Sequence, residues 1–339
     1  MDVPVGGMGG VPANATAAVI NVTATDTTAA SYLTVYPKGA SRPLASTLNW
    51  TAGKTVPNLT ELELGAGGML TVYNAFGNTD VVFDVNGYWS APSAGCPPDG
   101  LYRSLVPSRI LDTRNASKVA ANSTIDVQVT GADGVPASGV EAVTLNLTET
   151  NATAPSYITA YPTGSPRPLA SNVNFVAGQT VPNRVVVKLG TGGMITLYNA
   201  YGTVDLVADV NGWFTDNSGS TLATGSGDVF VGVTPNRILD TRGGGALQAN
   251  SSGVLTVSGV PAAAHAAVLN VTVTNPTAPS YLTVWPDGAP RPLASDLNFV
   301  SGLTVANLVV VQLGGGSKVD IYNAYGSVDV IVDVVGWYQ

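Results

Sequence analysis

The sequence predicts an all-β protein built from three copies of one antiparallel sandwich module, and three observations carry that prediction. The chain is rich in turn formers, with 39 glycines and 22 prolines among 339 residues, and only 11% of its residues are charged, against roughly 25% in ordinary soluble proteins. One block recurs at Ser31–Trp89, Ser156–Phe214 and Ser280–Tyr338. Its short segments alternate apolar and polar residues and favour Val, Ile, Thr and Tyr, as half-buried strands do. No window shows helical periodicity.

The recurring block carries the same motifs in the same order: SY(L/I)T, a Pro-x-Gly turn, RPLAS, TV, LGxG, YNA and a final Gly before two aromatics. The copies lie about 125 residues apart, beyond the roughly 20 to 50 residues of solenoid repeats, so each is expected to close its own core. A Pro-rich and a Gly/Ser-rich linker join them, which predicts an elongated array. The expected modules are 1–90, 103–215 and 229–339, with linkers at 91–102 and 216–228.

Turn signals divide the second copy into eight short strands. Eight antiparallel strands in about 110 residues predict a Greek-key, immunoglobulin-like β-sandwich. The expected strands are Arg109–Thr113, Thr124–Val129, Ala142–Thr150, Tyr157–Pro162, Asn172–Val176, Val185–Leu189, Met194–Ala200 and Val204–Phe214.

The first copy lacks the segment with which the other two begin. That segment reads SRILDTR at Ser108–Arg114 and NRILDTR at Asn236–Arg242, whereas Met1–Val5 aligns with the following strand, Ile125–Val129. We therefore expect the first module to lack its leading strand. Either the chain was cut there, or the strand comes from elsewhere, for example from a neighbouring chain by strand addition.

Charge and composition disfavour several classes of function. The net charge of -8 lacks the positive field that nucleic acid or anionic lipid requires. Every apolar run is cut within a few residues, so no membrane insertion is expected. One cysteine and one histidine exclude a disulfide scaffold, a Cys/His metal cluster and repeated histidine catalysis. We therefore expect no enzyme activity, no cofactor and no metal.

Recurring charged residues are interpreted as structural ion pairs, because the planar guanidinium suits bidentate contact with a carboxylate. A site for an acidic sugar or another carboxylate ligand is the alternative for the arginines. Calcium is the alternative for the aspartates, although it needs six to eight oxygens and Val335 replaces Asn86 in the third copy. The predicted ion-pair residues are Arg42, Arg167, Arg291, Asp112, Arg114, Asp240, Arg242, Asp84, Asp209 and Asp333.

Recurring aromatic residues permit a carbohydrate-binding interpretation, since exposed rings can stack on sugars. The aromatic pair that closes each copy is more typical of a residue pair that seals a core or packs on the next module. The candidate stacking residues are Tyr32, Tyr157, Tyr281 and Trp285.

The motifs RILDTR, SYLTVxPxGxxRPLASxLNF, TVPN, LYNAYG and DVNGWF together resemble a repeat of secreted and cell-surface proteins of actinobacteria and related soil bacteria. In those proteins the repeat stands in tandem or beside hydrolase domains. The resemblance covers nearly the whole chain and implies a secreted, non-catalytic β-rich accessory or structural module. It identifies no binding residue.

These observations predict a non-catalytic extracellular protein that is a structural or adhesive element of a bacterial cell surface, matrix or fibre. Repeated modules raise avidity or reach without new chemistry. Its expected partner is a further copy of the chain, joined by strand addition at the first module. The alternative is a multivalent, lectin-like protein that binds a cell-surface glycan.

Overall fold

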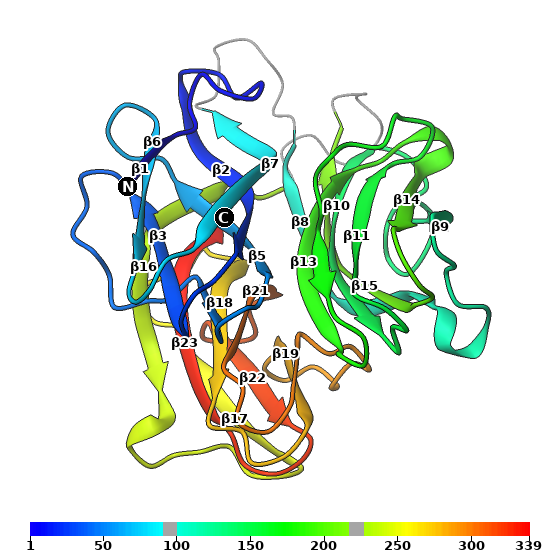
Figure 1. The fold of residues 1–339 in the computed structure, drawn as a ribbon. Coiled ribbons are helices and arrows are strands. Elements are labelled where there is room, and N and C mark those ends of the chain that lie inside the picture. The colour runs from blue at the N-terminus through cyan, green and yellow to red at the C-terminus, as the bar shows by residue number, and fades with distance from the viewer. Residues whose placement is uncertain (91–99, 217–226) are drawn as a thin grey trace.

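The computed structural model describes residues 1–90, 100–216 and 227–339, and strands make up most of them (Figure 1). Six antiparallel sheets pair into three sandwiches, which confirms the all-β sandwich prediction. Helical structure in these ranges is confined to three short 3₁₀ turns. No helix of the described part is long and apolar enough to span a membrane. Most of the two expected linkers, 91–102 and 216–228, lies outside the described residues.

The second module shows the complete arrangement, with one sheet in the order β13-β10-β15-β8 and the facing sheet in the order β12-β11-β14-β9. All eight expected strands are present. Their bounds are β8 Tyr102–Asp112, β9 Ser123–Gln128, β10 Val140–Thr150, β11 Ser156–Pro162, β12 Val173–Phe175, β13 Val181–Lys188, β14 Met194–Asn199 and β15 Asp205–Thr215.

The strand order of this module is that of a jelly roll, which combines two Greek keys in two facing sheets. Only the β11–β12 hairpin joins two strands of the same sheet, and every other connection crosses to the facing sheet. The strand order therefore keeps the predicted β-sandwich but differs from the immunoglobulin-like order that was expected. The apolar side chains that alternate along each strand meet between the two sheets and form the core.

Two strands begin earlier than the sequence predicted. Strand β8 starts at Tyr102 and β13 at Val181. The sequence prediction began each strand after its proline, Pro107 or Pro182, because a proline usually interrupts a strand. Both are edge strands of their sheet. A missing backbone N–H is tolerated at a sheet edge, so the proline does not end the strand there.

The third module repeats this order in two four-stranded sheets, β16-β23-β18-β21 and β17-β22-β19-β20. Its strands are β16 Phe230–Asp240, β17 Ser251–Thr256, β18 Ala266–Thr274, β19 Ser280–Pro286, β20 Leu297–Phe299, β21 Val305–Gln312, β22 Lys318–Asn323 and β23 Asp329–Tyr338.

The first module has a four-stranded sheet, β1-β6-β3-β4, and a sheet of only three strands, β5-β2-β7. Strand β1 pairs with β6 as β9 pairs with β14, which confirms the alignment of the first residues with the second strand of the other modules. Within the described ranges no strand pairs with the outer edge of β7. The bounds are β1 Asp2–Pro4, β2 Ala15–Thr25, β3 Ser31–Pro37, β4 Leu48–Trp50, β5 Val56–Glu63, β6 Met69–Asn74 and β7 Asp80–Ser90.

The three modules pack around a pseudo-threefold axis, so the expectation of an elongated array is wrong. Strands β5, β13 and β21 contact one another at the centre of the molecule (Figure 1). A ring of buried asparagines, Asn58, Asn183 and Asn307, joins the modules, since each side-chain oxygen accepts a backbone N–H from another module. The donors are Leu59 to Asn183, Arg184 to Asn307 and Leu308 to Asn58, each at 3.1 Å.

Candidate functional site

Strands β8 and β16, the leading strands of modules 2 and 3, are each held to their sheet by an arginine–aspartate contact. Arg109 donates through Nε and Nη2 to both carboxylate oxygens of Asp209, at 2.8 and 3.2 Å. Arg237 makes the same two contacts with Asp333, at 2.9 and 3.3 Å. Burial raises the pKa of both aspartates, and the arginine opposes that rise. Each leading strand thus brings the positive charge that its buried carboxylate needs.

Asp84 has the corresponding position in β7 of module 1, where the part of the chain that the structure describes offers it no hydrogen-bond or ion-pair partner. Partial burial raises the pKa of its carboxyl group. A carboxylate that is partly withdrawn from water without a partner is unfavourable. Asp84 is therefore a candidate acceptor for a guanidinium group.

The apolar side chains of β7 are exposed where their counterparts in β15 are covered. Val82, Val85 and Tyr88 are 45%, 40% and 47% exposed. The counterparts in β15 are Val207 at 4%, Val210 at 0% and Trp213 at 5%. The side chains of β15 are less exposed because β15 pairs along this length with the leading strand β8. The outer edge of β7, here called the open edge, is thus bordered by exposed apolar side chains and pairs with no strand among the residues that the structure describes.

The three RPLAS arginines, predicted as ion-pair residues, each lie over a tyrosine ring. Within the described ranges none of them contacts a carboxylate. Their guanidinium groups lie within 4 Å of the ring centroids, a cation–π geometry that holds the RPLAS loop to the neighbouring strand. The distances are 3.9 Å for Arg42 over Tyr73, 3.7 Å for Arg167 over Tyr198 and 3.6 Å for Arg291 over Tyr322.

The remaining predicted charged residues pair locally at the end of each leading strand. Arg114 donates through Nε to Asp112 at 2.8 Å, and Arg242 does the same to Asp240 at 2.9 Å. The hydrogen bond from Arg242 lowers the pKa of Asp240 to about 2. Such exposed pairs add little stability.

The structure places the predicted stacking aromatics in half-buried or buried positions. Tyr32, Tyr157 and Tyr281 pack against neighbouring tyrosines, with ring centroids about 6 Å apart. Trp285 is buried and donates through Nε1 to the Ala289 carbonyl at 2.9 Å. The three most exposed rings were not predicted from the sequence, although each follows a YNA motif and precedes a glycine. They are Phe76, Tyr201 and Tyr325.

A depression of about 820 Å³, here called the axial funnel, opens at the end of the pseudo-threefold axis near the start of β5, β13 and β21. Corresponding residues of all three modules line it, and most of its surface is apolar. Two of the exposed rings, Phe76 and Tyr201, also line it. Its aromatic wall is made by Trp50, Phe175 and Phe299.

The closing aromatics of the three modules, which lie at the ends of β7, β15 and β23, gather in one cluster. Trp89 lies 5.8 Å from Phe214 and 5.9 Å from Tyr338, measured between ring centroids. The buried Glu61 carboxylate accepts hydrogen bonds from Trp89 Nε1 at 2.7 Å and from the Tyr338 hydroxyl at 2.8 Å. Burial raises the pKa of Glu61 to about 7, although these two hydrogen bonds oppose the rise. The cluster seals the contact between modules.

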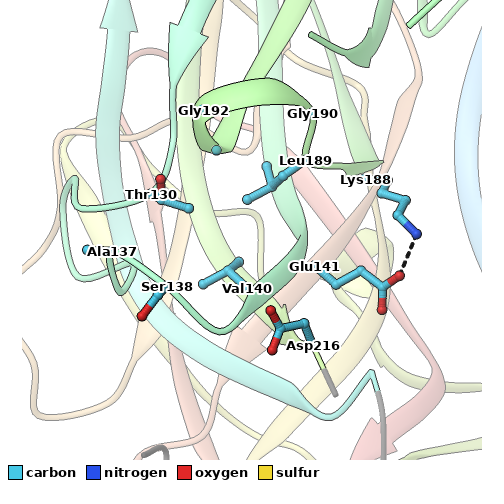
Figure 2. A pocket seen from close by; sticks show the side chains of 11 residues that line it. Thr130, Ala137, Ser138, Val140, Glu141, Lys188, Leu189, Gly190, Gly192 and Asp216 are labelled. Carbon is cyan, nitrogen blue, oxygen red and sulfur yellow. Dashed lines mark hydrogen bonds and ion pairs between the residues drawn. The ribbon is translucent and has the colours of Figure 1, made fainter. Parts of the chain in front are cut away.

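A second pocket, of about 620 Å³, lies on module 2 between the β9–β10 loop and the end of β13 (Figure 2). Its Lys188 ammonium contacts Glu141 at 2.6 Å, and the Asp216 carboxylate lies close by (Figure 2). The charge pattern is not repeated, because Glu63 and Gln312 replace Lys188 in the other modules. Neither histidine nor cysteine lines this pocket.

Comparison with known proteins adds a structural likeness only. No family model and no curated protein matches the chain. Solved structures of Sulfolobus turreted icosahedral virus are similar at 10% identity and a TM-score of 0.21, over 100% of this chain and 82% of the matched chain. A structure described as a triple jelly roll in an archaeal virus gives the same score, and the STIV MCP gives 0.19 over 68% of this chain and 96% of the other. No functional statement follows from TM-scores this low.

Proposed function

We propose that the protein is a non-catalytic structural or adhesive element of a bacterial cell surface, matrix or fibre, acting outside the cell. The observation that carries the proposal is the open edge of β7, where one of three equivalent sheets ends with a strand that no other described strand pairs with. An unpaired edge with exposed apolar side chains is a template for joining another chain. The resemblance to repeats of secreted actinobacterial proteins supports the extracellular setting.

The contacts of the other recurring polar residues also support a structural role. The arginines and aspartates of modules 2 and 3 contact one another, tyrosine rings or backbone groups within the chain. The recurring asparagines hold modules together. The recurring polar residues thus make contacts that stabilise the fold. Among the described residues, the open edge is where the corresponding arginine–aspartate contact is not made.

Electron microscopy of the protein isolated from the producing cells tests this proposal. We expect filaments, sheets or other high-mass assemblies. Val85→Lys should be released from them as free protein, because strand addition would bury its ammonium group, as the counterpart Val210 is buried. Val254→Lys, on an exposed position of β17, is the matched control and should stay in the assembly. Native protein that is entirely monomeric would contradict the proposal.

Carbohydrate binding in the axial funnel is a second candidate. It is favoured by the exposed rings Phe76 and Tyr201 at a mainly apolar depression with contributions from all three modules. A glycan array with the full chain tests it. Phe76→Ala together with Tyr201→Ala should abolish retention, and Leu44→Ala, at an exposed loop position outside the funnel lining, should not. If no glycan is retained by the unaltered protein, this candidate is excluded.

A further inference from the structure

We propose that each module binds an acidic polysaccharide along a surface that leads from the rim of the axial funnel to the RPLAS arginine, which pairs with a carboxylate group of the ligand. We thereby name the class of glycan for the second candidate function, carbohydrate binding, on which the inference rests. In module 2 this surface, here called the aromatic track, consists of Tyr201, Tyr157, Tyr198 and Arg167. The corresponding residues are Phe76, Tyr32, Tyr73 and Arg42 in module 1, and Tyr325, Tyr281, Tyr322 and Arg291 in module 3.

The rings of the track lie on the outward face of the sheet β12-β11-β14-β9, because the residues that alternate with them point into the core. Tyr201 is 63% exposed, and its backbone N–H donates to Ser156 Oγ at 2.8 Å. The ring centroid of Tyr157 lies 6.5 Å from that of Tyr201 and 6.3 Å from that of Tyr198. The track is thus a continuous row of aromatic side chains that begins at an exposed ring.

The arginine at the end of each track is exposed, and its guanidinium group lies over a tyrosine ring. Within the described part of the chain, none of the N–H groups of these three side chains donates a hydrogen bond. The chain has 22 acidic and 14 basic residues, so acidic partners are abundant. Five other arginines each contact an aspartate: Arg109, Arg114, Arg184, Arg237 and Arg242. The three track arginines are therefore prepared for a carboxylate group, which the planar guanidinium fork fits.

The RPLAS loop has anchors that do not involve the arginine side chain. In module 2, Thr159 Oγ1 donates to the Ala170 carbonyl at 2.8 Å, and Asn21 Nδ2 of module 1 donates to the Ser171 carbonyl at 2.8 Å. The other two modules repeat both anchors. A proline follows the arginine in every module and restricts the backbone further. Because the loop is already held, Arg167 loses little conformational entropy when it binds a ligand.

A recurring asparagine lies beside each track and can accept a hydroxyl group of a sugar. Asn174 of β12 pairs with Tyr157 of β11 and lines the axial funnel. Its Nδ2 donates to Ser171 Oγ at 3.0 Å, whereas its Oδ1 accepts no hydrogen bond from the residues that the structure describes. Asn49 and Asn298 have the same place and the same donor contact. A ring face, a hydroxyl acceptor and a guanidinium group together fit a sugar that carries a carboxylate group, such as a uronic acid.

A polymer of such sugars is the expected ligand because the molecule presents the same site in three modules. A chain that repeats one unit can occupy several equivalent sites, and each further contact then adds to the retention of the whole molecule. The net charge of -8 does not prevent this binding, since exposed charges are screened over roughly 8 Å at physiological ionic strength. The guanidinium group is thus the charge that the bound carboxylate meets.

Surface plasmon resonance with the full chain over immobilised polygalacturonate tests the inference. We expect binding, with dextran, a neutral polysaccharide, and polyglutamate, a carboxylate polymer without sugar rings, each retained at least roughly 10-fold more weakly. Arg42→Gln, Arg167→Gln and Arg291→Gln combined should weaken binding at least roughly 100-fold. Lysine at the same three positions should restore only part of it, because an ammonium group lacks the planar fork.

The matched control combines Arg114→Gln with Arg242→Gln. These arginines are also exposed, but each contacts an aspartate, so their removal should leave binding unchanged. Urea denaturation verifies that every variant is folded.

Three results would overturn the inference: no binding of polygalacturonate, binding that the three glutamine substitutions leave unchanged, or equal binding of polyglutamate, which would identify an acidic polypeptide as the ligand. Retention of neutral glycans that depends on Phe76 and Tyr201 but not on the arginines would reject the acidic ligand and keep carbohydrate binding in the funnel. Arginine-dependent binding of polygalacturonate by a protein that is monomeric in its source would support the inference and contradict the proposed assembly.

Discussion

Two buried glutamates stand at positions where the other modules have no charge. Glu61 is replaced by Val186 and Val310, and Glu149 by Ala24 and Val273. Burial raises the pKa of Glu61 to about 7 and that of Glu149 to about 8. Folding therefore favours the protonated form of both groups, since their ordinary pKa is 4.5.

Glu149→Val should stabilise the protein at neutral pH, because the buried counterpart Val273 shows that a valine fits this position. The unfolded chain ionises Glu149 near pH 4.5, whereas the folded chain keeps it protonated until about 8. The gain at pH 7 should exceed the gain at pH 4 by on the order of 3 kcal/mol. Urea denaturation at the two pH values measures it, and equal gains would contradict the assigned pKa.

Glu61 makes the free energy of unfolding depend on pH in the same direction. Its contribution is fully present below pH 4.5, is lost as the pH rises to about 7, and is constant above that. The loss should be on the order of 3 kcal/mol. In the Glu149→Val background, Glu61→Gln should remove this slope in urea denaturation between pH 4.5 and 7. A slope unchanged by Glu61→Gln would assign it to other groups.

At the scale of the strand, the same sequence has different neighbours in different modules. β7, β15 and β23 share the motif of an aspartate three residues before a glycine, yet among the described residues a leading strand lies beside β15 and β23 alone. Ion pairing of Asp209 and Asp333 could be predicted because an aspartate recurs at this position in every module, but their partners Arg109 and Arg237 were not among the predicted ion-pair residues. The arginine–tyrosine contacts could not be predicted, because the register of β3 against β6 decides which ring faces the RPLAS loop.

Gly212→Ala should destabilise the protein by about 1–3 kcal/mol, because its Cβ overlaps the Tyr102 ring. Gly87→Ala should be neutral or stabilising by up to about 1 kcal/mol, because its Cβ meets open space and alanine loses less backbone entropy on folding. Urea denaturation followed by tryptophan fluorescence compares the two. Equal destabilisation would mean that the position beside Gly87 is already filled.

At the scale of the molecule, three modules share one centre. The asparagine ring, the Arg184–Asp296 ion pair at 3.0 Å and the closing aromatics all cross module boundaries. Linker composition predicted independent modules because it indicates how freely a chain bends between domains. The prediction was wrong because linker composition carries no information on whether the domain surfaces fit together.

Asn183→Ala should lower the free energy of unfolding by roughly 1–3 kcal/mol, since it leaves the Leu59 N–H and the Asn21 oxygen without their partner. Since the modules bury this ring together, we also expect the unaltered protein to unfold in one transition. Calorimetry checks both points. Three separate transitions, with only one of them shifted by the substitution, would contradict a shared core.

The sequence by itself determined the strand content and the threefold repeat. These properties follow from local patterns of residue type and from comparison of the three aligned copies with one another. Only the tertiary structure decided the packing around one axis, the exposed rings at the axial funnel and the open space beside Gly87. Those features arise where surfaces distant in sequence meet, and their geometry depends on shape complementarity that no local pattern records.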